Sequence, residues 1–369
     1  MNFIKPDFNN CNLCISSTFA KYLGAPNDKP IIPELDARLK KDYKNVVFII
    51  FDGLGIYPLK KHAAVADFLR EHTVKTLVST FPSTTTNATT SMITNKYPLE
   101  HGWFGWNLNF PEVGRNVELF TGLDAETGKK VDCVMPISDH DDYYFYKGKG
   151  DIAVFTVMPP FFQVTNPDRQ RIITNLDELY NRIADITALD CKKFVYCYFG
   201  EPDMTMHDYG VSSTRAEKKI KSINDTVRKM AENFKDALFV ITADHGQVDV
   251  EGYTEFYKDK ELNDLLECPA FLDSRSPAFR VKRGKEEYFE KTFTERYGED
   301  FVLYKSKDLI VQGFFGANGT YGNLLGDYIG IGTFTHKQFL PFENSHRYKG
   351  HHCSLTEEME VPLIVIDGR

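Results

Sequence analysis

The sequence predicts an α/β fold, with a doubly wound, mostly parallel sheet that carries helices on both faces. Apolar, β-branched runs alternate with segments of helical periodicity through the first two-thirds of the chain. Parallel strands are covered on both faces and therefore appear as continuous apolar runs. Several runs are followed at once by Asp, Thr or His, the side chains that carry chemistry at the edge of such a sheet. We expect strands at 46–51, 74–79, 152–157, 194–199, 238–242 and 359–366.

Helices are predicted where apolar residues recur at spacings of three and four. They cover 58–71, 176–189 and 214–234, and a further helix should begin near Thr85. Between 248 and 350 the pattern changes to a strand at 278–281, a helix at 286–297 and a strand at 328–335, with many glycines between them. We therefore expect a catalytic core from 1–250 and 350–369, an inserted α+β cap from 251–349, and an irregular excursion over the site at 108–150.

Composition narrows the possible functions. The net charge of -8 argues against a surface that coats nucleic acid, although a bound metal pair would still admit a nucleotide substrate. No apolar run approaches the roughly 20 residues that span a bilayer, and the first residues lack a signal-peptide pattern, so we expect a cytoplasmic protein without membrane contact. The seven cysteines are expected to be reduced thiols. Cys11 and Cys14 have metal-like or redox-like spacing, but without a second pair or a βαβ context neither reading is favoured.

Carboxylate and imidazole side chains follow three predicted strands. Asp52 follows the strand at 46–51, Asp203 and His207 follow 194–199, and Asp244-His245-Gly246 follows 238–242. All are ordinary zinc ligands. Asp52 could instead belong to an Asp-Gly turn, and Asp203 could cap a helix beside a surface histidine. Two adjacent polar residues at 244–245 would be costly to bury without a partner, which favours a metal.

Two further segments could complete such a site. Thr85 follows Phe81-Pro82-Ser83-Thr84 at a predicted helix start, where a metal could activate its hydroxyl, although an N-cap is the commoner role. His352 precedes the last predicted strand, and His351 competes for the same role. The acidic cluster at 139–142 also resembles a metal site, but its charge favours a solvated loop.

As an ordered set, these segments resemble the type I phosphodiesterase and nucleotide pyrophosphatase/phosphodiesterase group of the alkaline phosphatase superfamily. The resemblance runs from 46 to 246 and resumes at 350–362. It implies two zinc ions, or manganese or iron, which accept much the same ligands. Counting back from the recurrent segment at 97–102 identifies Thr85 as the nucleophile. The implied ligands are Asp52, Thr85, Asp244 and His245 for one metal and Asp203, His207 and His352 for the other. Cys353 stands where the group usually has glycine.

The resemblance implies a hydrolase in which Thr85 attacks phosphorus and forms a covalent phosphothreonine. The substrate would be a small phosphate ester, possibly a nucleotide. A diester or pyrophosphate is favoured over a monoester because no arginine occurs from 71 to 107. Trp106 could stack on a base or could pack in the core, and Asn107 is a candidate for holding a phosphoryl oxygen. The alternatives are a phosphomonoesterase, a phosphonate hydrolase, and a non-catalytic metal- or nucleotide-binding protein.

Overall fold

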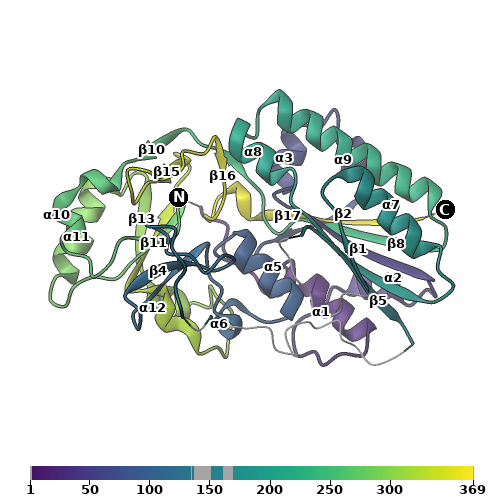
Figure 1. Cartoon of the computed structure of the whole chain (residues 1–369), viewed down its shortest axis with the longest axis horizontal. Helices are drawn as coiled ribbons and strands as arrows, with labels where there is room; N and C mark the ends of the chain where they lie inside the picture. Colours follow the sequence, from purple (N-terminus) through teal and green to yellow (C-terminus); the bar gives the residue numbers. More distant parts are fainter. Residues whose placement is uncertain (1, 134, 137–150, 161–168, 369) are drawn as a thin grey trace.

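The computed structural model describes residues 2–133, 135–136, 151–160 and 169–368. Its larger unit is a seven-stranded sheet in the order β2-β17-β8-β1-β7-β5-β6, on the right of Figure 1. The strands are β1 (Asn45–Phe51), β2 (Thr73–Val78), β5 (Ala153–Met158), β6 (Gln170–Ile172), β7 (Lys193–Phe199), β8 (Ala237–Thr242) and β17 (Glu360–Asp367). All six strands predicted for the main sheet are present in it.

The sheet is parallel except for β17, which runs antiparallel to both β2 and β8. Every residue of β1, β7 and β8 is buried. Those strands are the continuous apolar runs of the sequence, and they are buried because helices cover both faces of the sheet. The predicted doubly wound, mostly parallel architecture is confirmed.

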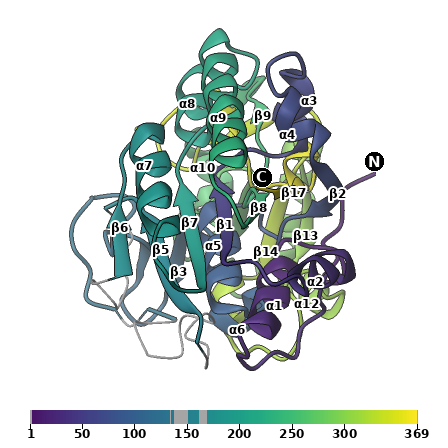
Figure 2. The same cartoon turned by 90° about the vertical axis from the view of Figure 1, so that its right-hand side faces the viewer.

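Helices on opposite faces of the main sheet are visible in Figures 1 and 2: α3, α8 and α9 lie on one side, and α1 and α5 on the other. The helices of this unit are α1 (Leu13–Tyr22), α2 (Pro33–Leu39), α3 (Ile56–Lys61), α4 (Asp67–Glu71), α5 (Thr85–Thr94), α6 (Pro98–His101), α7 (Leu176–Thr187), α8 (Asp203–Tyr209) and α9 (Thr214–Asn233). The single helix predicted at 58–71 is wrong. The chain turns between α3 and α4 at His62, whose buried ring lies 2.6 Å from the Val211 carbonyl oxygen.

A second, antiparallel sheet lies beside the first, on the left of Figure 1, in the order β13-β14-β12-β11-β3-β4. Its strands are β3 (Asn107–Phe110), β4 (Arg115–Glu118), β11 (Phe271–Asp273), β12 (Ser276–Phe279), β13 (Phe301–Lys305) and β14 (Tyr328–Gly332). The predicted helix at 286–297 is α11 (Glu286–Tyr297). The other elements of this region are β9 (Val248–Asp249), β10 (Gly252–Thr254), α10 (Lys260–Asn263), α12 (Ser306–Val311), β15 (Lys337–Phe339), β16 (Gly350–His351) and short 3-10 helices at Phe256–Lys258, Tyr321–Leu325 and Glu357–Met359.

The second sheet joins distant parts of the chain. The β3–β4 hairpin pairs with β11 through Leu272 and Asn107, so residues 107–118 share a sheet with strands from 271–332. The irregular excursion expected at 108–150 is therefore wrong for this hairpin, which is regular because Leu108 and Val117 pack into the apolar core of the second sheet. The acidic cluster at 139–142 lies outside the described residues. The division into a core and a 251–349 cap stays a proposal, and the hairpin belongs to the cap's sheet.

Within the described part of the chain, no helix combines the length and the apolar character needed to cross a membrane.

Candidate metal centre and active site

Three carboxylates meet at one edge of the main sheet because their strands are neighbours. β1 pairs in parallel with β7 on one side and with β8 on the other. Asp52 directly follows β1, Asp203 begins the helix after β7, and Asp244 follows β8. Since the carboxyl ends of parallel strands share an edge, the three side chains are brought together.

The turn after Asp52 brings the backbone at Gly53 into contact with Asp203 and Asp244. Gly53 has φ +70°, and a Cβ at this position would lie 3.0 Å from the Cβ of Asp203. Its backbone N–H donates to Asp244 Oδ1 at 3.1 Å. The Asp-Gly pair is therefore a tight turn, and the close approach of Asp203 requires glycine there.

Asp52, Asp244 and His245 form the first group able to hold a metal. His245 Nε2 lies 3.3 Å from Asp52 Oδ1 and 3.6 Å from Asp244 Oδ2. Both of these oxygens are buried and accept no hydrogen bond from a described residue. Buried carboxylate oxygens without partners are costly, and a cation shared with the imidazole would satisfy both. The residues therefore fit a metal ion.

The three histidines of the site are oriented alike. In each, Nδ1 lies against a backbone carbonyl oxygen: His207 at 2.8 Å from Gly350, His245 at 2.9 Å from Gly246, and His352 at 3.1 Å from Ser83. An Nδ1–H that donates to a carbonyl fixes the tautomer and leaves the Nε2 lone pair free. All three rings therefore present a ligand nitrogen to the carboxylates.

The second predicted set, Asp203, His207 and His352, lies beside the first. Asp203 Oδ2 is 3.2 Å from His207 Nε2, and Asp203 Oδ1 is 3.9 Å from His352 Nε2. The His245 and His352 ring centroids are only 3.8 Å apart. Potential metal ligands here group as Asp203, His245 and His352 and as His207, His351 and His352. The two predicted sets thus form one continuous cluster.

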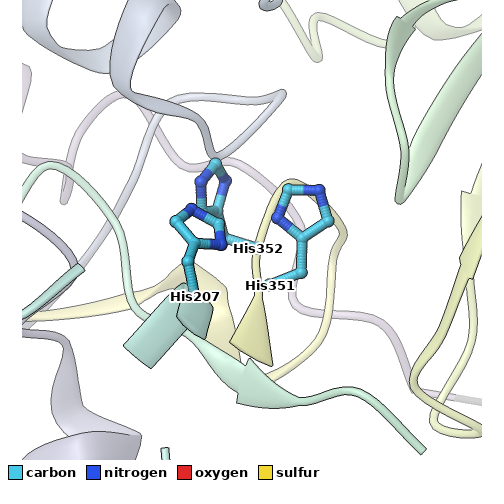
Figure 3. Close-up of side chains that lie close together, drawn as sticks. All are labelled: His207, His351 and His352. Atoms are coloured by element: carbon cyan, nitrogen blue, oxygen red, sulfur yellow. The ribbon is translucent and has the colours of Figure 1, made fainter. Parts of the chain in front are cut away.

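His351 and His352 have different surroundings. The short strand β16 pairs with β9 and ends at His351, and His352 directly follows it. Figure 3 shows their rings gathered with His207 from α8. His351 Nε2 contacts the Ser274 hydroxyl and lies 3.3 Å from Asp273 Oδ1, and its Nδ1 has no partner among the described residues. His351 is thus tied to the second sheet, whereas His352 faces Asp203.

Thr85 is the first residue of α5, and its hydroxyl donates to His245 Nε2 at 3.2 Å. The N-cap of this helix is Thr84, whose side chain caps nothing and donates instead to Asp273 Oδ2 at 3.1 Å. The alternative role of Thr85 as an N-cap is therefore wrong. Of the residues from 83 to 86, Thr85 alone lines the cavity described below.

Electrostatics explain why the cluster needs positive charge. Burial, together with Asp244 and Asp203, raises the pKa of Asp52 well above its usual value. Burial and Asp203 raise the pKa of Asp244 to about 7. Burial opposes a charged His207, but the Asp203 carboxylate outweighs it and raises the His207 pKa. Three carboxylates confined in a buried site repel one another, and a divalent cation would compensate them.

A cavity of about 460 Å³ opens onto this cluster between the two sheets. Its lining includes Thr85 and the potential metal ligands Asp203, His207, His351 and His352. Its described lining includes the acidic residues Glu118 and Asp273 but no lysine or arginine. The cavity can therefore hold a small molecule against Thr85, but its described lining offers no lysine or arginine for a second anionic group.

The two candidate substrate residues, Trp106 and Asn107, both line this cavity. Trp106 is 43% exposed and packs edge-on against Phe120, whereas Trp103 is 9% exposed and belongs to the core of the second sheet. The buried Oδ1 of Asn107 has no partner among the described residues. The aromatic stretch at 103–106 thus has one residue placed for stacking.

Several residues contact the site although no sequence pattern predicts them. The Tyr198 hydroxyl donates to Asp52 Oδ2, and Gln247 Nε2 donates to Asp203 Oδ1 at 2.7 Å. Asp273 contacts Thr84 and His351 from the second sheet. It follows Leu272, whose φ of +83° is unusual for a residue with a side chain. No strand is predicted from the sequence at 271–273, so no sequence pattern marks Asp273.

The chain matches a known family model and resembles curated relatives over part of its length. The family model described as "Type I phosphodiesterase / nucleotide pyrophosphatase" matches residues 46–295, more than half of the chain. Ectonucleotide pyrophosphatase/phosphodiesterase family member 7 of Mus musculus and of Rattus norvegicus are each 35% identical over 83 residues. That alignment covers 21% of this chain and only 17% of the length of either relative.

Solved structures share the fold over most of the chain. Murine ectonucleotide pyrophosphatase / phosphodiesterase 5 has a TM-score of 0.63 at 17% identity and covers 88% of both chains. An inactive form of that protein in complex with AMP has a TM-score of 0.61. Phosphonoacetate hydrolase from Sinorhizobium meliloti 1021, in complex with phosphonoformate, has a TM-score of 0.61 at 14% identity and covers 87% of this chain and 89% of its own. At such identities the likeness is one of fold.

Proposed function

Because the chain belongs to the type I phosphodiesterase / nucleotide pyrophosphatase family, we propose that it is a metal-dependent hydrolase of phosphodiester or pyrophosphate bonds. Thr85 is its nucleophile. The observation that carries this proposal is the position of the Thr85 hydroxyl, 3.2 Å from His245 Nε2, at the wall of the cavity and beside the buried, unpartnered oxygens of Asp52 and Asp244.

Seven residues would hold two metal ions. Asp52, Thr85, Asp244 and His245 are assigned to one ion, and Asp203, His207 and His352 to the other. When bound, a divalent cation supplies a lower pKa for a coordinated hydroxyl and positive charge for phosphoryl oxygens. Nitrogen and carboxylate ligands of this kind suit zinc, with manganese or iron as the alternatives.

The chemical role of Thr85 follows from its place at the start of α5. The first N–H groups of a helix have no partner within the helix, so they can donate to an anionic phosphoryl group. Thr85 Oγ1 forms a bond to phosphorus as the bond to the leaving oxygen breaks, and the leaving group takes up a proton. Water then attacks phosphorus, the bond to Thr85 Oγ1 breaks, and the hydroxyl regains its proton.

The cavity supports a diester over a monoester. A monoester dianion carries more negative charge than a diester, and the described lining contains no lysine or arginine to meet it. The carboxylates of Glu118 and Asp273 also face this cavity. Trp106 and Asn107 are assigned to the group attached to the phosphate, by stacking and by hydrogen bonding. A nucleotide is the proposed group, in line with the relative that binds AMP.

A phosphonate hydrolase is the second candidate, because the Sinorhizobium meliloti phosphonoacetate hydrolase shares the fold. Phosphonoacetate carries a carboxylate in addition to its phosphonate. The described lining of the cavity has no lysine or arginine to bind that carboxylate. This candidate therefore ranks below the diesterase. We also propose a reducing compartment such as the cytoplasm, because none of the seven cysteines is in a disulfide.

The test compares four substrates on the zinc-loaded protein: bis(p-nitrophenyl) phosphate, thymidine 5′-monophosphate p-nitrophenyl ester, p-nitrophenyl phosphate and phosphonoacetate. We expect kcat/KM to be highest for a diester. Higher values for the monoester or for phosphonoacetate would replace the proposed reaction by that alternative. Zinc binding with no hydrolysis of any of the four would support a non-catalytic metal-binding protein.

Replacement of the nucleophile is the second arm. Thr85→Ala should lower kcat for the diester by at least about 10³-fold, because the covalent step is lost. Thr94→Ala is the matched control, since Thr94 lies in the last turn of the same helix and its hydroxyl bonds only the Thr90 carbonyl. Full activity of Thr85→Ala would contradict the assignment.

A further inference from the structure

Cys11 and Cys14 form a close thiol pair near the N-terminus. Their Sγ atoms are 3.8 Å apart, and each residue is 1% exposed. Among the described cysteines no other pair makes a thiol–thiol contact. The spacing of the two residues in the sequence therefore becomes a contact in space.

The backbone around the pair has the strand-to-helix form that the sequence did not reveal. Cys11 forms an isolated parallel bridge with Val78, and Asn12 N–H donates to the Val78 carbonyl at 3.0 Å. The segment thereby extends the edge of the main sheet beside β2 and leads directly into α1. Cys11 therefore lies at the edge of the sheet and Cys14 in the first turn of a helix, a position that favours thiolate formation.

The two thiols have different acidities. A hydrogen bond from Cys11 lowers the pKa of Cys14, which lies in the first turn of α1, although burial opposes the shift. Burial raises the pKa of Cys11. Thiol–disulfide exchange needs one thiol that forms a thiolate readily and a second that resolves the mixed disulfide. Cys14 suits the first role and Cys11 the second.

Asn12, one of the two residues between the cysteines, reaches the backbone of the metal-ligand cluster. Asn12 Nδ2 donates to the backbone carbonyl of Asp244 at 2.9 Å, and the Ser79 hydroxyl donates to the same oxygen at 2.6 Å. Asn12 is completely buried. A disulfide requires the sulfurs to approach to about 2.05 Å, much closer than the 3.8 Å seen here. Closing the distance between the two sulfurs would shift the backbone on both sides of Asn12.

We propose that Cys11 and Cys14 form a reversible disulfide that acts on Asp244 through Asn12. The oxidant is a low-molecular-weight disulfide. The Cys14 thiolate attacks one of its sulfurs and releases one thiol, forming a mixed disulfide. The Cys11 thiolate then attacks Cys14 Sγ, forms the Cys11–Cys14 bond and releases the second thiol. The protein loses two electrons and two protons, and the oxidant gains both.

Access to the pair is controlled by the segment that precedes it. Cys14 Sγ donates to the Phe8 carbonyl at 3.3 Å, and the Phe8 ring packs against Tyr97 with a centroid distance of 4.9 Å. Because both thiols are buried, this segment must move before a disulfide can reach Cys14. Oxidation should therefore be slow compared with that of an exposed dithiol.

The first test counts thiols. The zinc-loaded protein is equilibrated for a day in buffers of different reduced-to-oxidised glutathione ratio, denatured in an alkylating agent and weighed by mass spectrometry. We expect seven alkylated cysteines under reducing conditions, in agreement with the sequence, and two fewer under oxidising conditions. Peptide mapping should place the missing pair at Cys11 and Cys14. Seven alkylated cysteines at every ratio, or a missing pair elsewhere, would overturn the proposal.

Two variants make the count specific. Cys14→Ser should give the same number of alkylated cysteines in all buffers. Cys191→Ser, at a half-buried cysteine without a thiol neighbour, should still lose two on oxidation. Their thermal unfolding in reducing buffer identifies any variant that fails to fold. The number of alkylated cysteines does not depend on catalysis, so this test is independent of the proposed hydrolase activity.

The link to Asp244 is tested by zinc release. The reduced and oxidised proteins are transferred to a buffer free of glutathione and mixed with a chromogenic chelator. We expect the oxidised protein to release zinc several-fold faster, and Cys14→Ser to release it at one rate after either treatment. Equal rates for the two wild-type forms would refute the connection through Asn12.

Discussion

The Arg275 guanidinium and the Glu358 carboxylate form a fully buried ion pair at the junction of the two sheets, with Nε 2.9 Å from Oε1. Arg275 precedes β12 of the second sheet, and Glu358 precedes β17 of the main sheet. Glu358 also accepts hydrogen bonds from the Ser354 N–H and the Thr356 hydroxyl. The pair therefore fixes the turn that follows His352, and it ties the two walls of the cavity together.

Loss of one partner of this pair should be costly. Arg275→Met leaves a buried carboxylate without its cation, and we expect the free energy of unfolding to fall by roughly 3–5 kcal/mol. Replacing both partners, Arg275→Met with Glu358→Met, should recover much of that loss because no buried charge remains. Urea denaturation followed by circular dichroism measures both. Equal destabilisation by the single and the double variant would show that packing, not charge, holds the junction.

The same pair predicts a loss of stability in acid. Burial opposes ionisation of Glu358, but Arg275 outweighs it and holds the pKa of Glu358 below its usual value. A carboxyl whose folded pKa lies below its unfolded value, about 4.3 for glutamate, stabilises the protein above that value. The contribution disappears as the pH falls through the folded pKa. Urea midpoints between pH 7 and pH 3 should therefore fall more steeply for the wild type than for Glu358→Gln. Parallel curves would contradict this origin.

The two adjacent histidines should behave differently towards metal. His352→Ala removes a ligand that faces Asp203, and we expect the affinity for the second zinc to fall by at least about 100-fold. His351→Ala should retain two zinc ions, because its Nε2 faces Ser274 and Asp273 instead. Zinc content after dialysis against a chelator, measured by mass spectrometry, separates the two variants. Loss of zinc from His351→Ala alone would exchange their roles.

Trp106 should affect the nucleoside part of a substrate. Stacking of a base on an aromatic ring is worth roughly 1–3 kcal/mol, so Trp106→Ala should lower kcat/KM for thymidine 5′-monophosphate p-nitrophenyl ester by about tenfold or more. Methyl p-nitrophenyl phosphate has the same leaving group but no nucleoside, and its kcat/KM should change little. An equal fall for both substrates would mean that Trp106 only supports packing against Phe120.

An element of this fold could be predicted from the sequence where the contacts that determine its position are local in the chain. The strands β1, β7 and β8 are recognisable because each is an unbroken apolar run, and Asp52, Asp203 and Asp244 follow from them by parallel pairing. The β3–β4 hairpin was missed because its place is set by pairing of Asn107 with Leu272, far along the chain. Asp273 was missed for the same reason.

The choice between His351 and His352 also lay beyond the sequence. Two neighbouring imidazoles have the same chemistry, and only the carbonyl of Ser83 on one side and the Asp273 carboxylate on the other distinguish them. The backbone of Leu272, at φ +83°, helps to place Asp273 there. Such a conformation is imposed by tertiary contacts and leaves no periodic pattern to read.

The position of β17 has a consequence for how the protein is made. This strand lies between β2 and β8, and it is supplied by the same C-terminal stretch that brings His352 to Asp203. Without that stretch, no strand of the main sheet pairs with β2, and the second metal set lacks His352. A chain that lacks this stretch is therefore incompletely folded and also lacks one residue of the second metal set. Closure of the main sheet and assembly of the second metal set are thus one event.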